Sequence, residues 1–247
     1  MKQNIYDNEE FFSSYRALRE TDNNYNVLLE QPAMMNLLPN LKNKIVLDLG
    51  CGFGDNCRDF INKGAKRVVG IDISKNMLEL AKIKNCDCNI DYKNMPLENL
   101  SDLNGKFDFI YSSLCFHYIK DFDKLIKDIA DRMQPNGTLL FSQEHPVVTA
   151  SAGVAGYFKV DDNENKVYCF CNYQDEESER IEKWYVDGVI KYHRTFATII
   201  NALVNNGFVI EKIVEPIPSK FALEKRAGLI KEFIKPTFLI IKAKYNK

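Results

Sequence analysis

Apolar residues occur in short runs that alternate with amphipathic stretches from residue 44 to residue 142. Alternation of strands with helical patterns predicts a mostly parallel sheet with helices on both faces. Two later apolar runs, 208–214 and 237–243, bring the expected number of strands to seven, giving a Rossmann-like α/β fold. The other expected strands are 44–49, 67–71, 89–92, 107–112 and 138–142, and the expected helices are 55–63, 74–84, 121–133 and 195–205.

The first 40 residues carry a helical pattern, because Tyr15, Leu18, Tyr25 and Leu28 recur at spacings near three and four. We expect this segment to form a helical lid or, alternatively, an amphipathic helix that only packs on the sheet. Farther along the chain, the Ser74 hydroxyl is suited to cap the helix that follows it.

The alternation stops after Pro146. Residues 146–192 hold aromatic-rich runs at 167–173 and 181–190, and Asp187-Gly188 is a hairpin turn signal. We therefore expect an inserted small antiparallel β cover within a single domain. The density of aromatic side chains favours a pocket wall, the packing of a thin β layer, or a dimer contact.

A glycine-rich loop follows the first apolar strand, with Asp48 preceding Gly50, Gly52 and Gly54. Glycines allow tight turning and the close approach of a ligand, and the helix behind the loop offers free N–H groups. Asp72 ends the second strand, where a carboxylate can accept both hydroxyls of a ribose. The pattern indicates an adenosine-containing ligand, and its G-x-G-x-G spacing differs from the dinucleotide G-x-G-x-x-G.

Together, Asp48, the three glycines and Asp72 resemble the class I S-adenosylmethionine-dependent methyltransferases. Residues 107–118 are similar to the fourth-strand segment of that family, and 133–140 to the run before its fifth strand. The resemblance covers residues 40–145 and is nearest to the small-molecule type of the ubiquinone pathway. It implies a lid (1–40), a cofactor-binding core (41–145), an inserted substrate cover (146–192) and a C-terminal completion of the sheet (193–247).

The resemblance also implies a role for individual residues toward S-adenosylmethionine. The glycines would approach its amino acid half, Asp48 would hold its ammonium group, and Asp72 would bind its ribose. Ile73, Asn94 and Met95 would flank the adenine, Ser112, Ser113 and Leu114 would line the methionine side, and His117 would lie at the rim. Further expected cofactor contacts are Tyr15, Arg19, Cys51, Asn56 and Met77.

Each of these polar residues also has a purely structural interpretation. Asp48 could cap the amides of its own loop, as aspartates in turns do. Asp72 could be an N-cap for the next helix, and His117 an ordinary residue at a helix start. The joint occurrence of the acids with the glycines favours the cofactor interpretation.

Candidates for acceptor chemistry follow the fifth strand and the insert. Glu144 and His145 end the fifth strand, and His193 and Arg194 precede the last predicted helix. We take His145, His193 and Arg194 as catalytic candidates, since a base or an anion-binding group can orient an acceptor. The alternatives are a structural histidine before a proline bend and a surface arginine.

Composition limits the partners. Lys plus Arg number 33 and Asp plus Glu 34, without a basic stripe, which disfavours a nucleic-acid partner. The N-terminal residues are polar and no apolar run reaches 18 residues, so neither a signal peptide nor a membrane span is expected.

The seven cysteines suit a reducing cytoplasm, and we expect no bound metal. The pairs Cys86/Cys88 and Cys169/Cys171 have C-x-C spacing. We interpret them as buried small hydrophobes rather than zinc ligands, which usually have wider spacing.

The sequence therefore predicts an enzyme that transfers a methyl group from S-adenosylmethionine to a small molecule, as a monomer or homodimer. One alternative is an NAD-dependent oxidoreductase, which the loop spacing disfavours. The other is a non-catalytic regulator that binds S-adenosylmethionine.

Overall fold

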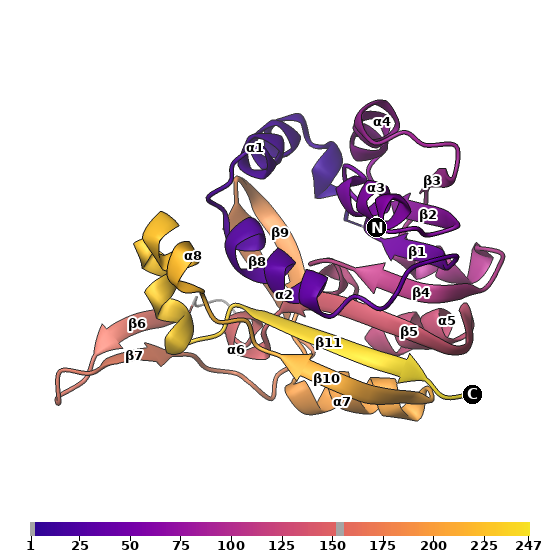
Figure 1. Ribbon diagram of the computed structural model, residues 1–247. Helices are drawn as coiled ribbons and strands as arrows, with labels where there is room; N and C mark the ends of the chain where they lie inside the picture. Colours follow the sequence, from indigo (N-terminus) through magenta and orange to yellow (C-terminus); the bar gives the residue numbers. More distant parts are fainter. Residues whose placement is uncertain (1–2, 152–155) are drawn as a thin grey trace.

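A computed structural model of the chain describes residues 3–151 and 156–247 (Figure 1). Its centre is a seven-stranded sheet in the order β10-β11-β5-β4-β1-β2-β3. Strand β11 pairs antiparallel with β10 and β5 and the other pairs of this sheet are parallel, so the predicted mostly parallel Rossmann-like fold is confirmed. The strands of the sheet are β1 (Ile45–Leu49), β2 (Arg67–Asp72), β3 (Ile90–Asn94), β4 (Phe107–Ser112), β5 (Met133–Glu144), β10 (Phe208–Val214) and β11 (Phe238–Tyr245).

Helices cover both faces of this sheet, as the alternation predicted. The α-helices are α1 (Glu9–Arg19), α2 (Gln31–Asn36), α3 (Asp55–Asn62), α4 (Lys75–Lys84), α5 (Phe122–Ala130), α6 (Pro146–Thr149), α7 (Phe196–Asn205) and α8 (Lys220–Lys225). Shorter helical elements are η1 (Ile5–Asp7), η2 (Asn26–Glu30), η3 (Leu97–Asp102), η4 (Phe116–Tyr118) and η5 (Ala227–Phe233).

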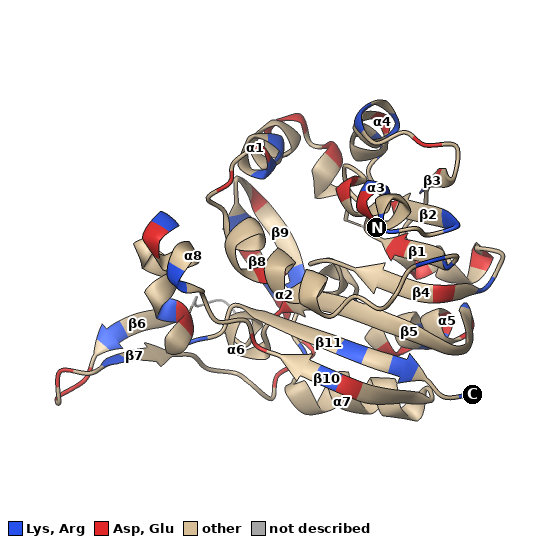
Figure 2. Cartoon of the chain, viewed as in Figure 1, with Lys and Arg blue, Asp and Glu red and all other residues tan. Residues whose placement is uncertain are grey.

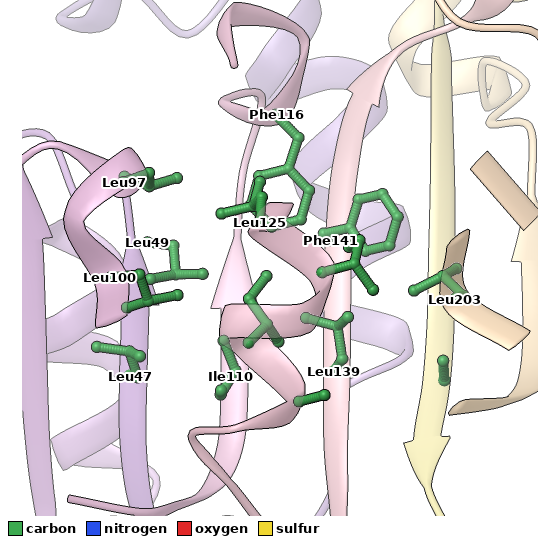
Figure 3. Packing of buried hydrophobic residues seen from close by; sticks show 14 of the residues in the cluster. Leu47, Leu49, Leu97, Leu100, Ile110, Phe116, Leu125, Leu139, Phe141 and Leu203 are labelled. Carbon is green, nitrogen blue, oxygen red and sulfur yellow. The ribbon is translucent and has the colours of Figure 1, made fainter. Parts of the chain in front are cut away.

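Successive side chains of the strands enter two separate cores, because side chains alternate between the faces of a strand. Leu47 and Leu49 pack with α5, α7 and η3 in one core (Figure 3). Val46, on the other face of β1, packs with Phe60 of α3 and Met34 of α2. Because β1 pairs in parallel with both β2 and β4, the carboxyl ends of these three strands lie at one edge of the sheet.

Several element boundaries differ from the sequence prediction. The N-terminal 40 residues are not one helix: α1 ends at Arg19, and η2 and α2 follow after a break. The helix predicted at 121–133 ends at Ala130, and β5 begins at Met133. Pro135 to Gly137 do not close that helix but form an irregularity within β5, where the pairing with β4 shifts register.

The described part of the insert forms two hairpins rather than one continuous cover. One pairs β6 (Tyr157–Val160) with β7 (Lys166–Cys169), and the other pairs β8 (Glu179–Trp184) with β9 (Val186–Tyr192). The second chain reversal is at Tyr185, with φ of 63°, so the predicted turn at Asp187-Gly188 is wrong. Residues 152–155 of the predicted insert lie outside the described residues.

The two hairpins diverge in space. The β6–β7 hairpin extends beside α8, at the lower left of Figure 1. Lys231, on η5, lies 5.3 Å from the ring of Phe158 on β6. The β8–β9 hairpin instead reaches α1, where the rings of Phe11 and Trp184 are 5.2 Å apart. Only this second hairpin therefore adjoins the N-terminal helix.

The anchor of the β8–β9 hairpin is Arg180, which is 1% exposed. Its guanidinium donates to the carbonyls of Thr149 (2.9 Å) and Ala150 (2.8 Å) and to those of Asp175 and Ser178. Charge-assisted bonds to four main-chain carbonyls fix the start of β8.

Positive and negative side chains are interspersed along the elements, as Figure 2 shows. Among the described residues, no helix combines the length and apolar character needed to cross a membrane. All seven cysteines are free thiols, but Cys86, Cys88 and Cys171 are exposed, so the prediction that the C-x-C pairs are buried is wrong. These side chains lie in or beside surface loops and do not alternate into a core.

Candidate active site

A cavity of about 520 Å³ lies at the carboxyl ends of the central strands. Its volume is in the range of small-molecule sites. The glycine loop, the end of β2, the N-terminal segment and the β8–β9 hairpin all contribute to its wall. Of the residues expected to contact the cofactor, those that line it are Tyr15, Arg19, Gly50, Cys51, Gly52, Asn56, Asp72, Ile73, Met77, Ser113, Leu114 and His117.

The glycine loop has left-handed backbone angles that only glycine adopts easily. The φ angles are 76° at Gly50, 53° at Gly52 and 79° at Gly54. The amides of Gly50 and Cys51 both donate to the carbonyl of Ile71, at 2.9 and 3.0 Å, which ties the loop to β2. A Cβ atom at Gly52 would meet no atom within 4 Å, so open space lies beside this backbone.

Asp72 connects the loop with the cavity. Its Oδ2 accepts from the Gly52 amide at 2.9 Å, and its Oδ1 accepts from the Ser74 amide at 2.9 Å. Burial raises the pKa of this carboxyl against the effect of these bonds. The N-cap of α4 is Ser74, so the alternative that Asp72 is the N-cap is wrong. The Asp72 carboxylate lines the cavity, where its remaining lone pairs can accept ligand hydroxyls.

Asp48 lies behind the loop and does not line the cavity. It is 1% exposed, its Oδ2 accepts from the Cys57 thiol at 3.3 Å, and burial raises its pKa to about 7. Its Oδ1 has no hydrogen-bond partner in the part of the chain that is described. An unpaired buried oxygen beside the loop fits a site that is completed by a bound cationic group or a bridging water.

Four other expected cofactor residues do not line the cavity either. Gly54 is the N-cap of α3 and faces the Tyr92 ring. Asn94 donates to the carbonyls of Asp72 and Ile73, at 3.1 and 2.8 Å. Met95 packs against the hydrophobic core. Ser112 donates to the carbonyl of Leu49 at 2.8 Å.

The N-terminal segment places a buried acid against Ser113 of the cavity lining, and sequence reasoning missed this acid. Glu30 is fully buried and accepts hydrogen bonds from Asn26 (2.7 Å), Ser113 (2.9 Å) and Ser142. Arg19 in turn donates to the side-chain oxygen of Asn26. The sequence feature that could have indicated Glu30 is its position directly after the apolar run Val27-Leu28-Leu29, within a helical pattern.

Aromatic rings from distant segments form one wall of the cavity. Tyr6 lies 5.3 Å from Tyr15 and 6.2 Å from Tyr118, and Tyr15 lies 5.8 Å from Trp184. Tyr15 also approaches Phe53 of the glycine loop at 6.2 Å. The wall therefore runs without interruption from the loop to the β8–β9 hairpin.

His117 lies in this wall and is 4% exposed. Burial, followed by the charges of Lys191 and Arg194, lowers the pKa of its imidazole well below the usual range. Its Nδ1 accepts from the Glu144 amide at 3.4 Å. The ring is therefore neutral at physiological pH, and its Nδ1 faces the end of β5.

The three predicted catalytic residues do not line the cavity. His145 is the N-cap of α6: its Nδ1 accepts from the Val147 amide at 3.2 Å, and its Nε2 lies 2.9 Å from a Glu215 oxygen. His193 bridges the Thr149 hydroxyl (2.8 Å) and the Tyr173 carbonyl (2.9 Å). Both imidazoles thus hold the polypeptide around α6.

Arg194 is likewise engaged away from the cavity. Its guanidinium donates to the main-chain carbonyls of Phe116, Ile119 and Lys120 and lies 4.8 Å from the Phe122 ring. Burial lowers its pKa to about 10. Its donors support η4, the element that carries His117.

Lys191 is a second residue that sequence reasoning missed. It lies on β9, lines the cavity, and its ammonium group contacts Glu144 of β5 at 2.6 Å and Glu182 of β8 at 2.7 Å. Its one indication in the sequence is that an ionisable residue occurs in a strand of alternating polar and apolar positions. Such a residue ordinarily faces water, so the pattern did not point to a site.

The chain was compared with known proteins. Residues 46–137 match the model of a methyltransferase domain. An uncharacterized protein of Haemophilus influenzae is 40% identical over 222 residues, which is 87% of each chain. The ubiquinone biosynthesis O-methyltransferase of Bartonella bacilliformis is 33% identical over 99 residues, a stretch that spans 39% of this chain and 40% of that protein.

Two solved structures are similar over most of the chain. One is a protein of Listeria monocytogenes assigned to the S-adenosylmethionine-dependent methyltransferases, with 35% identity and a TM-score of 0.80 over 88% of this chain and 97% of that one. The other is an S-adenosylmethionine-dependent methyltransferase of Mesorhizobium loti, with 34% identity and a TM-score of 0.78 over 87% and 97%.

The chain belongs to the class I S-adenosylmethionine-dependent methyltransferases. The enzyme class and the cofactor predicted from the glycine loop and its acids are thereby confirmed. The comparisons favour neither the oxidoreductase nor the non-catalytic regulator.

Proposed function

We propose that the cavity binds S-adenosylmethionine along the glycine loop and a small-molecule acceptor beneath the β8–β9 hairpin. The observation that carries this proposal is the convergence of both sets of residues on one cavity of about 520 Å³. The lid (1–40), the core (41–145) and the C-terminal completion (193–247) keep their expected roles. The role of substrate cover is restricted to the β8–β9 part of the insert.

Within this arrangement, Gly52 leaves room for the cofactor and Asp72 accepts its ribose hydroxyls. Ile73, Met77 and Leu97 supply apolar surface for the adenine, since all three line the cavity. Arg19 is the cation suited to the methionyl carboxylate, because Asn26 occupies only part of its guanidinium fork.

Methyl transfer makes modest demands on the protein. Bound S-adenosylmethionine supplies an electrophilic methyl group on a sulfonium centre. The residues of the chain then need to hold the acceptor in line with that methyl and to exclude water. The aromatic wall and the β8–β9 hairpin are suited to both tasks. Because His145, His193 and Arg194 support the backbone elsewhere, they are assigned positioning roles here.

A small-molecule acceptor is supported by the volume of the cavity, about 520 Å³, and by its aromatic lining, both of which resemble the sites of small ligands. Lys and Arg are interspersed with Asp and Glu along the elements drawn in Figure 2, which disfavours a nucleic-acid partner. The similarity to the ubiquinone biosynthesis O-methyltransferase of Bartonella bacilliformis spans 39% of this chain, and we do not extend the acceptor of that protein to this one.

Two truncations of the insert test the proposal. One replaces the β8–β9 turn around Tyr185 and removes Trp184, and its matched control shortens the β6–β7 turn at residues 161–165. Cofactor binding is measured by calorimetry with S-adenosylhomocysteine. Methyl transfer is measured as the formation of S-adenosylhomocysteine from S-adenosylmethionine in the presence of a panel of small acceptors. We expect both variants to bind, and only the β8–β9 variant to lose transfer.

Two outcomes would contradict the proposal. Loss of binding in a folded β8–β9 variant would make the hairpin part of the cofactor site. Undiminished transfer by the same variant would show that the acceptor does not bind beneath the β8–β9 hairpin.

A further inference from the structure

The end of the cavity formed by β5, β8 and β9 contains a partly buried cluster of three charged side chains. The ammonium group of Lys191 lies between the carboxylates of Glu144 (2.6 Å) and Glu182 (2.7 Å). All three side chains line the cavity, with 7%, 17% and 40% of their surface exposed, respectively. We refer to these residues as the carboxylate cluster.

This cluster has one more negative than positive charge. Burial alone would lower the pKa of Lys191, but the two carboxylates outweigh it and raise the pKa above the ordinary value. Lys191 is therefore a full cation and neutralises one of its two partners. The second oxygen of Glu144, Oε2, is buried and has no hydrogen-bond partner in the described part of the chain. A buried carboxylate with an unsatisfied oxygen gains most from an added donor.

Other cations nearby do not supply that donor. Lys183 lines the cavity but is 72% exposed and pairs with Asp187 at 3.5 Å. Arg194 does not line the cavity, and its guanidinium donates to the main-chain carbonyls of Phe116, Ile119 and Lys120. His117 is neutral, because burial and neighbouring cations lower its pKa. Lys235 interacts electrostatically with Glu144 but does not line the cavity. None of these neighbouring cations therefore places a free positive charge in the cavity lining beside the cluster.

Aromatic rings border the cluster. Trp184 has the Lys191 ammonium 5.9 Å from its ring, and the ring of Tyr118 lies 4.3 Å from that of His117. Tyr6 closes the wall opposite, 6.2 Å from Tyr118. Aromatic faces attract cations, and they also provide apolar surface for the body of a ligand. Carboxylate and aromatic groups together are the usual surroundings of an organic cation.

We propose that the methyl acceptor is a small amine whose protonated amino group binds Glu144 while its apolar body lies against Trp184 and Tyr118. This inference rests on the proposed function, since it places the acceptor beneath the β8–β9 hairpin. An anionic acceptor would have to lose its hydration beside two carboxylates, which makes the cluster a selectivity element against acids. Glu144 is thus a specificity-determining residue, whichever atom of the acceptor receives the methyl group.

The test uses three ligands of similar shape and different charge: phenethylamine, phenethyl alcohol and phenylacetate. Trp184 is the single tryptophan of the chain, so its fluorescence reports on this end of the cavity. Titrations are carried out on the full-length protein saturated with S-adenosylhomocysteine. We expect the amine to bind about tenfold more tightly than the alcohol, and phenylacetate to bind most weakly.

Glu144→Gln should reduce the preference for the amine over the alcohol to about one, because it removes the charge and keeps the shape. Glu177→Gln is the matched control: it lies in the same insert, is exposed, and does not line the cavity. It should retain the full preference. A preference unchanged in Glu144→Gln, or equally lost in both variants, would overturn the proposal.

Lys191→Met gives a second readout that a merely structural cluster would not produce. Removing the ammonium leaves two carboxylates for the amine, so phenethylamine should bind more tightly and raise the melting temperature more than in the unmodified protein. The inference is refuted if phenethylamine binds no more tightly to Lys191→Met than to the unmodified protein. It is also refuted if the unmodified protein prefers phenylacetate to the amine, or if it does not respond to the amine up to the solubility limit of that ligand. S-adenosylhomocysteine binding is measured first, so failure of the cofactor site is recognised separately.

Discussion

Gly52 offers the sharpest test of the cofactor site, because its substitution separates stability from binding. Its φ angle is 53°, and an added Cβ would meet no atom within 4 Å. Gly50, two residues earlier, would instead place a Cβ 2.6 Å from the Cys115 sulfur. A side chain at Gly52 therefore enters open space, and we expect that space to belong to the bound cofactor.

The cost to folding follows from the backbone angle alone. A left-handed conformation costs a residue with a Cβ roughly 1–2 kcal/mol, and the open surroundings add no overlap. For a chain of this length, each kcal/mol lowers the melting temperature by roughly 2–4 °C. Gly52→Ala should thus unfold about 2–8 °C lower. Gly105→Ala is the matched control, because its φ of 106° is also positive and its Cβ would also meet nothing within 4 Å.

Binding should respond far more strongly than stability. Gly52→Val should weaken S-adenosylhomocysteine binding by more than about tenfold, whereas Gly105→Ala should bind like the unmodified protein. Differential scanning calorimetry gives the melting temperatures, and isothermal titration gives the dissociation constants. A Gly52→Val protein that is folded and binds with unchanged affinity would show that the loop does not cradle the cofactor.

Three further predictions follow from single residues. Asp72→Ala should weaken binding of S-adenosylhomocysteine by roughly 1.5–3 kcal/mol, measured by titration calorimetry, because it removes acceptors for the ribose; unchanged affinity would exclude Asp72 from the site. Because burial raises the pKa of Asp48 from 3.8 to about 7, the folded state binds the extra proton and stability falls as pH rises through that interval. Asp48→Asn should flatten this decline in urea titrations at several pH values, and an identical pH profile would contradict the assignment. Arg180→Leu should destabilise the β8–β9 hairpin, seen as faster amide exchange there, because four carbonyls lose their donor; unaltered exchange would refute the anchoring role.

Much of the fold was encoded locally and could be predicted. Strands β1 to β4 appear as short apolar runs, and the Ser74 hydroxyl caps α4 by accepting from the Met77 amide at 3.1 Å. The glycine loop was recognisable because its left-handed angles exclude most other residues. Errors arose where tertiary pairing outweighed local signals. Pairing with β4 draws Pro135 to Gly137 into β5, and the β8–β9 register moves the turn from Asp187 to Tyr185.

The sequence by itself determined the class of enzyme, because the glycines that shape the loop and the acid that ends β2 lie close together in the chain. The acceptor side was decided only by the tertiary structure. Lys191 meets Glu144 across 47 positions of sequence, and Glu30 meets Ser142 across 112. Such partners are brought together by the packing of β9 and η2 against the sheet edge, and no local pattern encodes that packing. A long-range contact likewise decides the role of His145, whose ring nitrogen lies beside Glu215, a residue 70 positions away in the sequence. No local sequence motif indicates this pairing.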